Sequence, residues 1–170
     1  MLPLDSLQRE VLVWDDIDKL IDHLMPQFQS DFDALLMITR GGMIPGGILC
    51  EAMDIKNVLT AAVHFDEAVD QRIAWPTFMQ FPADTFVTGK RILVVDNIWG
   101  SGRTPVLVRG RLSAAGAQPE IAVLHFRPGS NIFHDAAPDY YGAITTRFIV
   151  YPWETPRERS SSFPPAPTSN

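Results

Sequence analysis

A wholly apolar run that ends in an acid and a glycine-rich turn is the feature that most constrains this fold. Residues 92–95 are Ile-Leu-Val-Val, and Gly89-Lys90 and Gly100 bound the surrounding run. A short apolar run between turn signals, rich in β-branched residues, predicts a strand over Arg91–Asp96. After the turn, a hydroxyl residue precedes a proline at Thr104-Pro105, an order that predicts a helix start capped by Thr104. A strand, a turn and a helix in this order are typical of an α/β fold.

That helix carries two glycines with different expected roles. Gly116 follows the apolar residues Val108, Leu112 and Ala115, and it is placed to end the helix. Gly110 lies in the helix interior, where glycine costs about 1 kcal/mol relative to alanine. We therefore expect close packing to require Gly110.

The remaining pattern alternates strands with helices. An apolar stripe at helical spacing covers Ile17, Leu20, Ile21 and Leu24, and Pro26 is expected to end that helix. A second, shorter helix is expected around Pro45–Met53. Further strands are predicted over residues 34–38, 58–63, 120–126 and 148–151. This alternation predicts a mainly parallel twisted sheet with helices on both faces.

Length and composition predict one domain, over residues 1–154. The chain has 170 residues, 46% of them hydrophobic, and residues 155–170 form a tail rich in Pro and Ser. Residues 64–89 lack a clear period but contain several aromatics, and we expect a flap that closes over a site. Trp75, Phe78 and Phe81 are expected either on one packed face of this flap or in a contact between subunits.

Composition and net charge argue against several classes of function. No apolar run is long enough to cross a bilayer, so a membrane span is not expected. The net charge of −6 argues against a nucleic-acid surface. The single cysteine, Cys50, cannot form an internal disulfide, which favours a cytoplasmic protein, and the four histidines lack zinc-ligand spacing.

Chemistry is expected at the carboxyl ends of the strands, where open parallel sheets bind ligands. The turn over residues 96–104 combines glycines, hydroxyl groups and a helix start, which together favour an anion. It matches neither a Walker loop nor a dinucleotide fingerprint. Taken alone, the turn is equally consistent with a tight connection, and Asp96 with a cap on backbone N–H groups.

Three segments together resemble a known family. Residues 92–104 are similar to the phosphoribosyl pyrophosphate motif of type I phosphoribosyltransferases. Residues 38–46, Ile-Thr-Arg-Gly-Gly-Met-Ile-Pro-Gly, resemble the pyrophosphate loop of bacterial xanthine–guanine phosphoribosyltransferases. Leu124–Pro128, Tyr140-Tyr141 and Phe148–Glu154 resemble the purine-binding hood of that subfamily, here about residues 127–154. The resemblance implies the type I phosphoribosyltransferase fold.

The resemblance also implies roles for individual residues. Asp96 and Arg40 would be catalytic, and Asp96 would hold Mg²⁺ through water. The 5′-phosphate would bind Gly100, Ser101, Gly102, Arg103 and Thr104; pyrophosphate would bind Thr39, Arg40, Gly41 and Gly42; the ribose would bind Asp96 and Asn97; and the base would bind Arg127, Phe148, Ile149 and Glu154. A cis peptide is expected between Thr39 and Arg40. Without the resemblance, Arg40 is also consistent with a solvated side chain, Arg127 with a surface ion pair and Phe148 with the core.

The implied reaction is Mg²⁺-dependent transfer of the phosphoribosyl group to a purine-like base, a step of purine salvage, in a homodimer or homotetramer. Two departures leave alternatives open. Asn97 replaces the second of two adjacent acids, and Gly100 stands where purine-specific members have an aspartate that handles the N7 proton. The base then either ionises by itself or loses its proton elsewhere. Otherwise the protein is a non-catalytic phosphoribosyl pyrophosphate or nucleotide-binding regulator, or a hydrolytic or phosphorolytic variant.

Overall fold

The computed structural model describes residues 8–65 and 76–155. The centre of the expected flap, including Trp75, and the expected tail beyond Thr155 lie outside the described residues. Within these ranges no helix has the length and apolar character needed to span a membrane.

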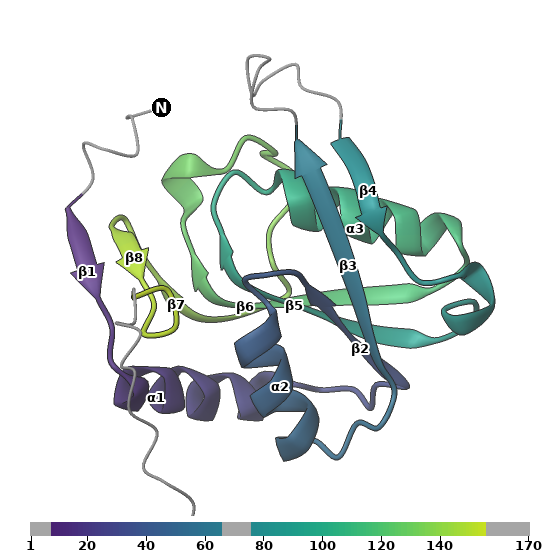
Figure 1. The fold of residues 1–170 in the computed structure, drawn as a ribbon, viewed down its shortest axis with the longest axis horizontal. Coiled ribbons are helices and arrows are strands. Elements are labelled where there is room, and N and C mark those ends of the chain that lie inside the picture. Colours follow the sequence, from purple (N-terminus) through teal and green to yellow (C-terminus); the bar gives the residue numbers. More distant parts are fainter. Residues whose placement is uncertain (1–7, 66–75, 156–170) are drawn as a thin grey trace, which may run out of the picture.

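Six of the described strands form one sheet (Figure 1). Their spatial order is β4 (Pro76–Gln80), β3 (Val58–Phe65), β2 (Ala34–Ile38), β5 (Arg91–Trp99), β6 (Gln118–Phe126) and β7 (Tyr140–Ile144). Every neighbouring pair is parallel except β3 and β4. The predicted mainly parallel sheet is therefore confirmed.

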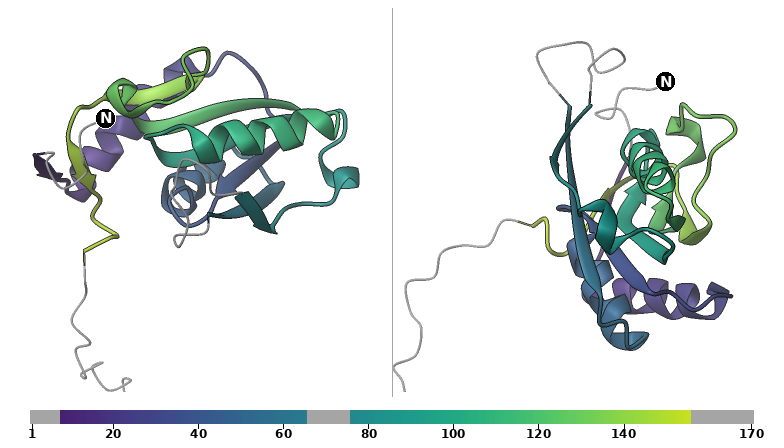
Figure 2. Two further views of the ribbon diagram at one scale, coloured as in Figure 1. Left: turned by 90° about the horizontal axis from the view of Figure 1, so that it is seen from above. Right: turned by 90° about the vertical axis from the view of Figure 1, so that its right-hand side faces the viewer.

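Helices cover both faces of this sheet, as predicted (Figure 2). Alternate residues of β5 point to opposite faces: Leu93 packs with α1 (Trp14–Leu24) and α2 (Met43–Ala52), whereas Val94 packs with α3 (Arg103–Ala114). Because both faces are buried, the central strands are continuous apolar runs. Short 3₁₀ turns occupy Met25–Gln27, Asp84–Phe86 and Pro128–Ser130.

A separate pair of strands lies beside the main sheet. β1 (Arg9–Val11) pairs in parallel with β8 (Phe148–Val150). The strand expected over residues 148–151 is thus present, but it is not a member of the main sheet. β1, β4 and β7 were not predicted, because their residues are exposed or half-buried and form no continuous apolar run, and only partners distant in sequence stabilise them.

Two expectations about α3 are wrong. The helix begins at Arg103, and its N-cap is Gly102 at φ 80°, so Thr104 lies inside the first turn and caps nothing. A Cβ built on Gly110 would meet no atom within 4 Å, so packing does not require that glycine. Gly116, at φ 83°, follows the end of α3 as expected.

The segment expected as a flap is partly sheet. His64 and Phe65 belong to β3, and β4 pairs antiparallel with that strand. Phe78 and Phe81 pack edge-to-face with ring centroids 5.0 Å apart, and both lie against the core on the α3 side. Closure of this segment over a site stays a prediction.

Candidate active site

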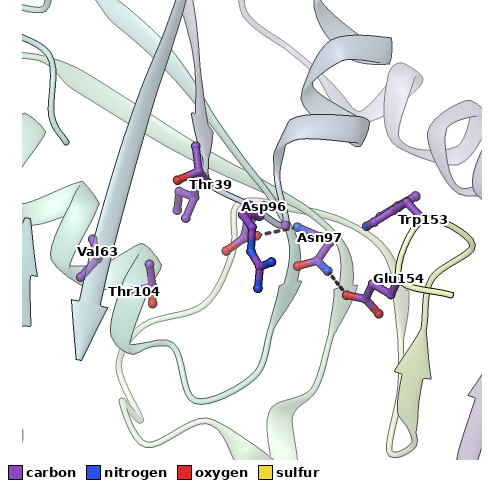
Figure 3. A pocket seen from close by; sticks show the side chains of 10 residues that line it. Thr39, Val63, Asp96, Asn97, Thr104, Trp153 and Glu154 are labelled. Carbon is purple, nitrogen blue, oxygen red and sulfur yellow. Dashed lines mark hydrogen bonds between the residues drawn. The ribbon is translucent and has the colours of Figure 1, made fainter. Parts of the chain in front are cut away.

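A cavity of about 690 Å³ lies where the carboxyl ends of β2 and β5 meet (Figure 3). The strand register pairs Met37 with Val95, so the residues that follow them reach the same edge of the sheet. The cavity is lined by Ile38, Thr39, Arg40, Gly41, Val63, Asp96, Asn97, Thr104, Trp153 and Glu154. Seven of the residues expected from the sequence are therefore brought together, with at least one from each of the four predicted subsites.

Asp96 is the carboxylate at the end of β5. One of its oxygens accepts a 2.8 Å hydrogen bond from the backbone N–H of Asn97. Burial raises the pKa of the Asp96 carboxyl to about 7. A cation bound at the cavity would oppose this effect and favour the ionised form.

The two glycines after Arg40 allow the loop to touch the end of β5. A Cβ at Gly41 would lie 2.3 Å from the amide oxygen of Asn97 and 2.5 Å from a carboxylate oxygen of Asp96. A Cβ at Gly42 would lie 2.1 Å from the carbonyl oxygen of Val95. Any side chain here would thus push the loop away from Asp96. The cis peptide expected between Thr39 and Arg40 is present.

The turn between β5 and α3 is the expected phosphate site. Gly102 adopts a left-handed conformation, and a Cβ there would lie 2.6 Å from the indole nitrogen of Trp99. The Ser101 hydroxyl accepts from the N–H of Arg103 at 3.4 Å. Of the five residues expected to bind the 5′-phosphate, only Thr104, in the first turn of α3, lines the cavity. The N-terminus of α3 nevertheless carries the partial positive charge of the helix dipole at this turn.

A buried network joins the hood to the end of β5. The Tyr151 hydroxyl donates to the carbonyl oxygen of Asn97 at 2.8 Å, and its oxygen lies 2.9 Å from Nδ1 of His125. Because the hydroxyl proton is used on Asn97, His125 must donate from Nδ1. Burial lowers the pKa of His125 to about 4 and raises that of Tyr151 well above its usual value, so both are neutral at pH 7.

Glu154 and Trp153 carry this network into the cavity. The Glu154 carboxylate accepts from the N–H of Tyr151 at 3.1 Å and from the side-chain amide of Asn97 at 3.5 Å (Figure 3). Trp153 stacks on Tyr151 with ring centroids 4.8 Å apart. The sequence reasoning did not single out Trp153, Tyr151 or His125 as site residues. Their only local signal is that they lie in the segments Leu124–Pro128 and Phe148–Glu154, which resemble the hood.

Three residues expected to bind the base do not line this cavity. Arg127, at the end of β6, is buried and is not a surface ion-pair partner. Phe148 is half-buried on β8, with the Arg9 guanidinium 5.6 Å from its ring centroid. Ile149 is buried and lies between Phe148 and Val150 on β8. The N–H of Phe148 and the C=O of Val150 form hydrogen bonds with the chain segment that contains β1. The backbone groups of Ile149 therefore point away from β1. Their roles toward a base stay predictions.

The donor set suits a magnesium-bound polyanion. Two carboxylates, Asp96 and Glu154, line a cavity that also holds Arg40 and adjoins a helix N-terminus. Mg²⁺ keeps several waters and usually takes one or two protein carboxylates together with phosphate oxygens. The residues present thus fit such a cation.

Comparisons with known proteins agree with this geometry. The family model described as phosphoribosyl transferase domain matches residues 4–158. A xanthine-guanine phosphoribosyltransferase of Roseobacter denitrificans is 31% identical over 125 residues, which cover 71% of this chain and 68% of that protein. One from Ruegeria sp. is 29% identical over 152 residues, covering 83% and 82%. The crystal structure of a purine phosphoribosyltransferase from Pyrococcus horikoshii superposes with a TM-score of 0.72 at 25% identity, covering 92% of this chain and all of that one.

Proposed function

Because this chain belongs to the phosphoribosyltransferase domain family, we propose that it transfers the 5-phosphoribosyl group of phosphoribosyl pyrophosphate to a ring nitrogen of a purine-like base. Pyrophosphate is the leaving group, and Mg²⁺ is required. The observation that supports the proposal is the contact of the Gly41-Gly42 loop with Asp96 and Asn97, because it brings the loop after β2 and the carboxylate at the end of β5 against one cavity. The purine phosphoribosyltransferases among the relatives support the substrate class.

Each side of the cavity meets one part of the donor. The 5′-phosphate binds at the N-terminus of α3, where Ser101 and Thr104 add hydroxyl groups. Asp96 accepts hydrogen bonds from the ribose hydroxyls, and Asn97 adds an amide without a second negative charge. Arg40 and the N–H groups of its loop bind the pyrophosphate. Mg²⁺ held by Asp96 through water would neutralise charge on the leaving group.

The chemical step breaks the bond between C1 of the ribose and the pyrophosphate oxygen, and it forms a bond from C1 to the base nitrogen. Preorganised positive groups favour this step because negative charge accumulates on the departing pyrophosphate. Arg40 and the loop amides are placed to supply them. The base would lie toward Arg127, Phe148 and the backbone groups of Ile149 that point away from β1.

A second candidate function is a regulator that binds phosphoribosyl pyrophosphate or a nucleotide without turnover. It is favoured by Gly100, which offers no side chain to take a proton from the base. Loss of such a general base costs typically 10²–10⁴-fold in rate. Such a regulator would keep the ligand-binding cavity and would not catalyse phosphoribosyl transfer.

Turnover distinguishes the two candidates. Pyrophosphate release should require Mg²⁺, phosphoribosyl pyrophosphate and one base from a panel of guanine, xanthine, hypoxanthine and adenine. Asp96→Asn should reduce kcat/KM for the donor by at least 100-fold. The matched control Asp22→Asn alters an exposed carboxylate on α1 and should change nothing. Donor binding by calorimetry without turnover of any base would favour the regulator.

We also propose a cytoplasmic location and a homodimer or homotetramer. The single cysteine suits a reducing compartment. Exposed apolar side chains such as Val11 and Met79 are available for contact between copies. Light scattering after gel filtration measures the assembly.

A further inference from the structure

Arg127 is a cation held inside the protein without a carboxylate beside it. Its side chain is only 9% exposed, and the described residues place no acid within salt-bridge distance of it. One terminal nitrogen donates weakly to the carbonyl oxygen of Arg147 at 3.4 Å, and the buried Nε has no hydrogen-bond partner. An unpaired buried charge is costly, because its lost hydration is not replaced. An anionic ligand beside Arg127 would supply the partner that the described residues do not.

The guanidinium is aimed at the turn that follows β5. The backbone N–H of Arg127 donates to the carbonyl oxygen of Trp99 at 3.0 Å, which fixes it beside the next residue, Gly100. The second terminal nitrogen lies 3.1 Å from the place that a Cβ at Gly100 would occupy, and among the described residues, apart from the two chain neighbours of Gly100, no other atom comes within 4 Å of that place. The positively charged guanidinium of Arg127 therefore lies beside the place where any other residue at position 100 would have its side chain.

The groups around Arg127 leave that charge uncompensated at neutral pH. Tyr151 and His125 are neutral because burial shifts the pKa of each away from its charged form. The nearby Arg147 pairs with Glu10. Asp96 and Glu154 belong to the other side of the network, where Glu154 accepts from Asn97 and Tyr151.

We propose, on the basis of the proposed function, that Arg127 makes this enzyme selective for oxopurines that bind as anions. A carboxylate at position 100 would repel an ionised base, whereas Gly100 removes that repulsion and leaves a buried cation in its place. A guanidinium also matches the adjacent O6 and N7 acceptors of an oxopurine, because its planar fork donates two parallel hydrogen bonds. Both acceptors are available only when N7 carries no proton.

The same arrangement explains why the reaction needs no carboxylate at position 100. An oxopurine anion in the tautomer whose imidazole ring carries no proton attacks C1 through a ring nitrogen that carries a lone pair. The bond from that nitrogen to C1 forms, the bond from C1 to pyrophosphate breaks, and pyrophosphate takes the electron pair. No proton is removed within the step. Xanthine ionises more readily than guanine or hypoxanthine, so it is the expected acceptor.

Equilibrium binding tests this without requiring turnover. Calorimetry at pH 8 compares the 5′-monophosphates of xanthosine and inosine, whose bases are respectively anionic and neutral. Wild type should bind the xanthine nucleotide at least tenfold more tightly. Arg127→Gln should abolish this preference by weakening the xanthine nucleotide alone. Gly100→Asp should also reduce the preference, since the new carboxylate pairs with Arg127 and repels the anion. Arg147→Gln, a partly exposed neighbour paired with Glu10, is the matched control.

Kinetics supply the second measurement. The ratio of kcat/KM for xanthine to that for hypoxanthine should rise with pH until xanthine is fully ionised, and Arg127→Gln should flatten this profile. The ratio cancels the titration of the enzyme, because both bases meet the same Asp96.

The outcomes separate this inference from the proposed function. Turnover without anion preference, or an equal loss for both nucleotides in Arg127→Gln, overturns the inference and leaves the function intact. Arg127-dependent preference in binding without turnover of any base overturns the function and supports the inference for a nucleotide-binding site.

Discussion

The hydroxyl of Tyr151 donates a 2.8 Å hydrogen bond to the backbone carbonyl of Asn97, the residue next to the Asp96 carboxylate. Tyr151 is 1% exposed and accepts in turn from Nδ1 of His125. The hood and the end of β5 are thus joined by a buried contact between residues 54 positions apart. This contact limits how far Asp96 can move relative to the hood.

Replacing Tyr151 with Phe should destabilise the protein by about 1–3 kcal/mol, because the Asn97 carbonyl and the His125 N–H lose their partner inside the protein. Urea unfolding measures this difference. Tyr141→Phe is the control, because Tyr141 on β7 is more exposed than Tyr151. Its free energy of unfolding should stay within about 0.5 kcal/mol of wild type. Equal stabilities for the two variants would show that the network contributes nothing.

The dependence of stability on pH should show that His125 is a neutral buried group in the folded protein. Its folded pKa of about 4 lies below the ordinary value of 6.5, so the unfolded chain takes up the proton first. The stabilisation from His125 is complete above pH 6.5 and is lost as the pH falls toward 4, by at most about 3 kcal/mol. Asp96 acts in the opposite sense: its pKa of about 7 is above the ordinary 3.8, so the folded state gains stability as pH falls from 7 to 4.

The effects of His125 and Asp96 on stability therefore offset each other in wild type as the pH falls. Variants that lack one of the two groups show the effect of the other alone. Between pH 6 and 5, His125→Asn should gain stability on acidification relative to wild type, by up to about 1.4 kcal/mol per pH unit. Asp96→Asn should lose stability relative to wild type by a similar amount. Urea titrations at several pH values measure both slopes. Parallel slopes in all three proteins would contradict this assignment.

Replacing Gly41 with Ala should abolish use of the phosphoribosyl donor, because the new Cβ would overlap the side chains of Asp96 and Asn97. We expect kcat/KM for the donor to fall at least 100-fold while thermal unfolding still shows a cooperative transition. Gly47→Ala on α2 is the matched control, since a Cβ there meets no atom within 4 Å. Normal donor kinetics in Gly41→Ala would mean that the loop does not approach β5 in solution.

Gly110→Ala should stabilise the protein by up to about 1 kcal/mol. The position is exposed in the middle of α3, and the added methyl group meets nothing. Alanine favours the helix and restricts the unfolded chain. A rise in the urea midpoint with unchanged donor kinetics is the expected result, and a loss of stability would indicate a contact that α3 makes outside the described residues.

The sequence by itself determined the parts that depend on local pattern. The apolar runs of β2, β5 and β6 are readable because burial on both faces requires nearly every residue to be apolar. The turn at Gly102 and the end of α3 at Gly116 are readable because each needs a left-handed residue. The motifs around Arg40 and Asp96 likewise lie in single short segments.

Only the tertiary structure decided which distant groups meet. The pairing of β1 with β8, the contact of Glu154 with Asn97 and the approach of Arg127 to Gly100 join residues that carry no local signal of one another. The empty space at Gly110 is of the same kind, since an amphipathic pattern says which face of a helix is buried but not what stands opposite each position. Such contacts depend on how strands and helices pack in three dimensions, and that packing sums many weak interactions over the whole chain.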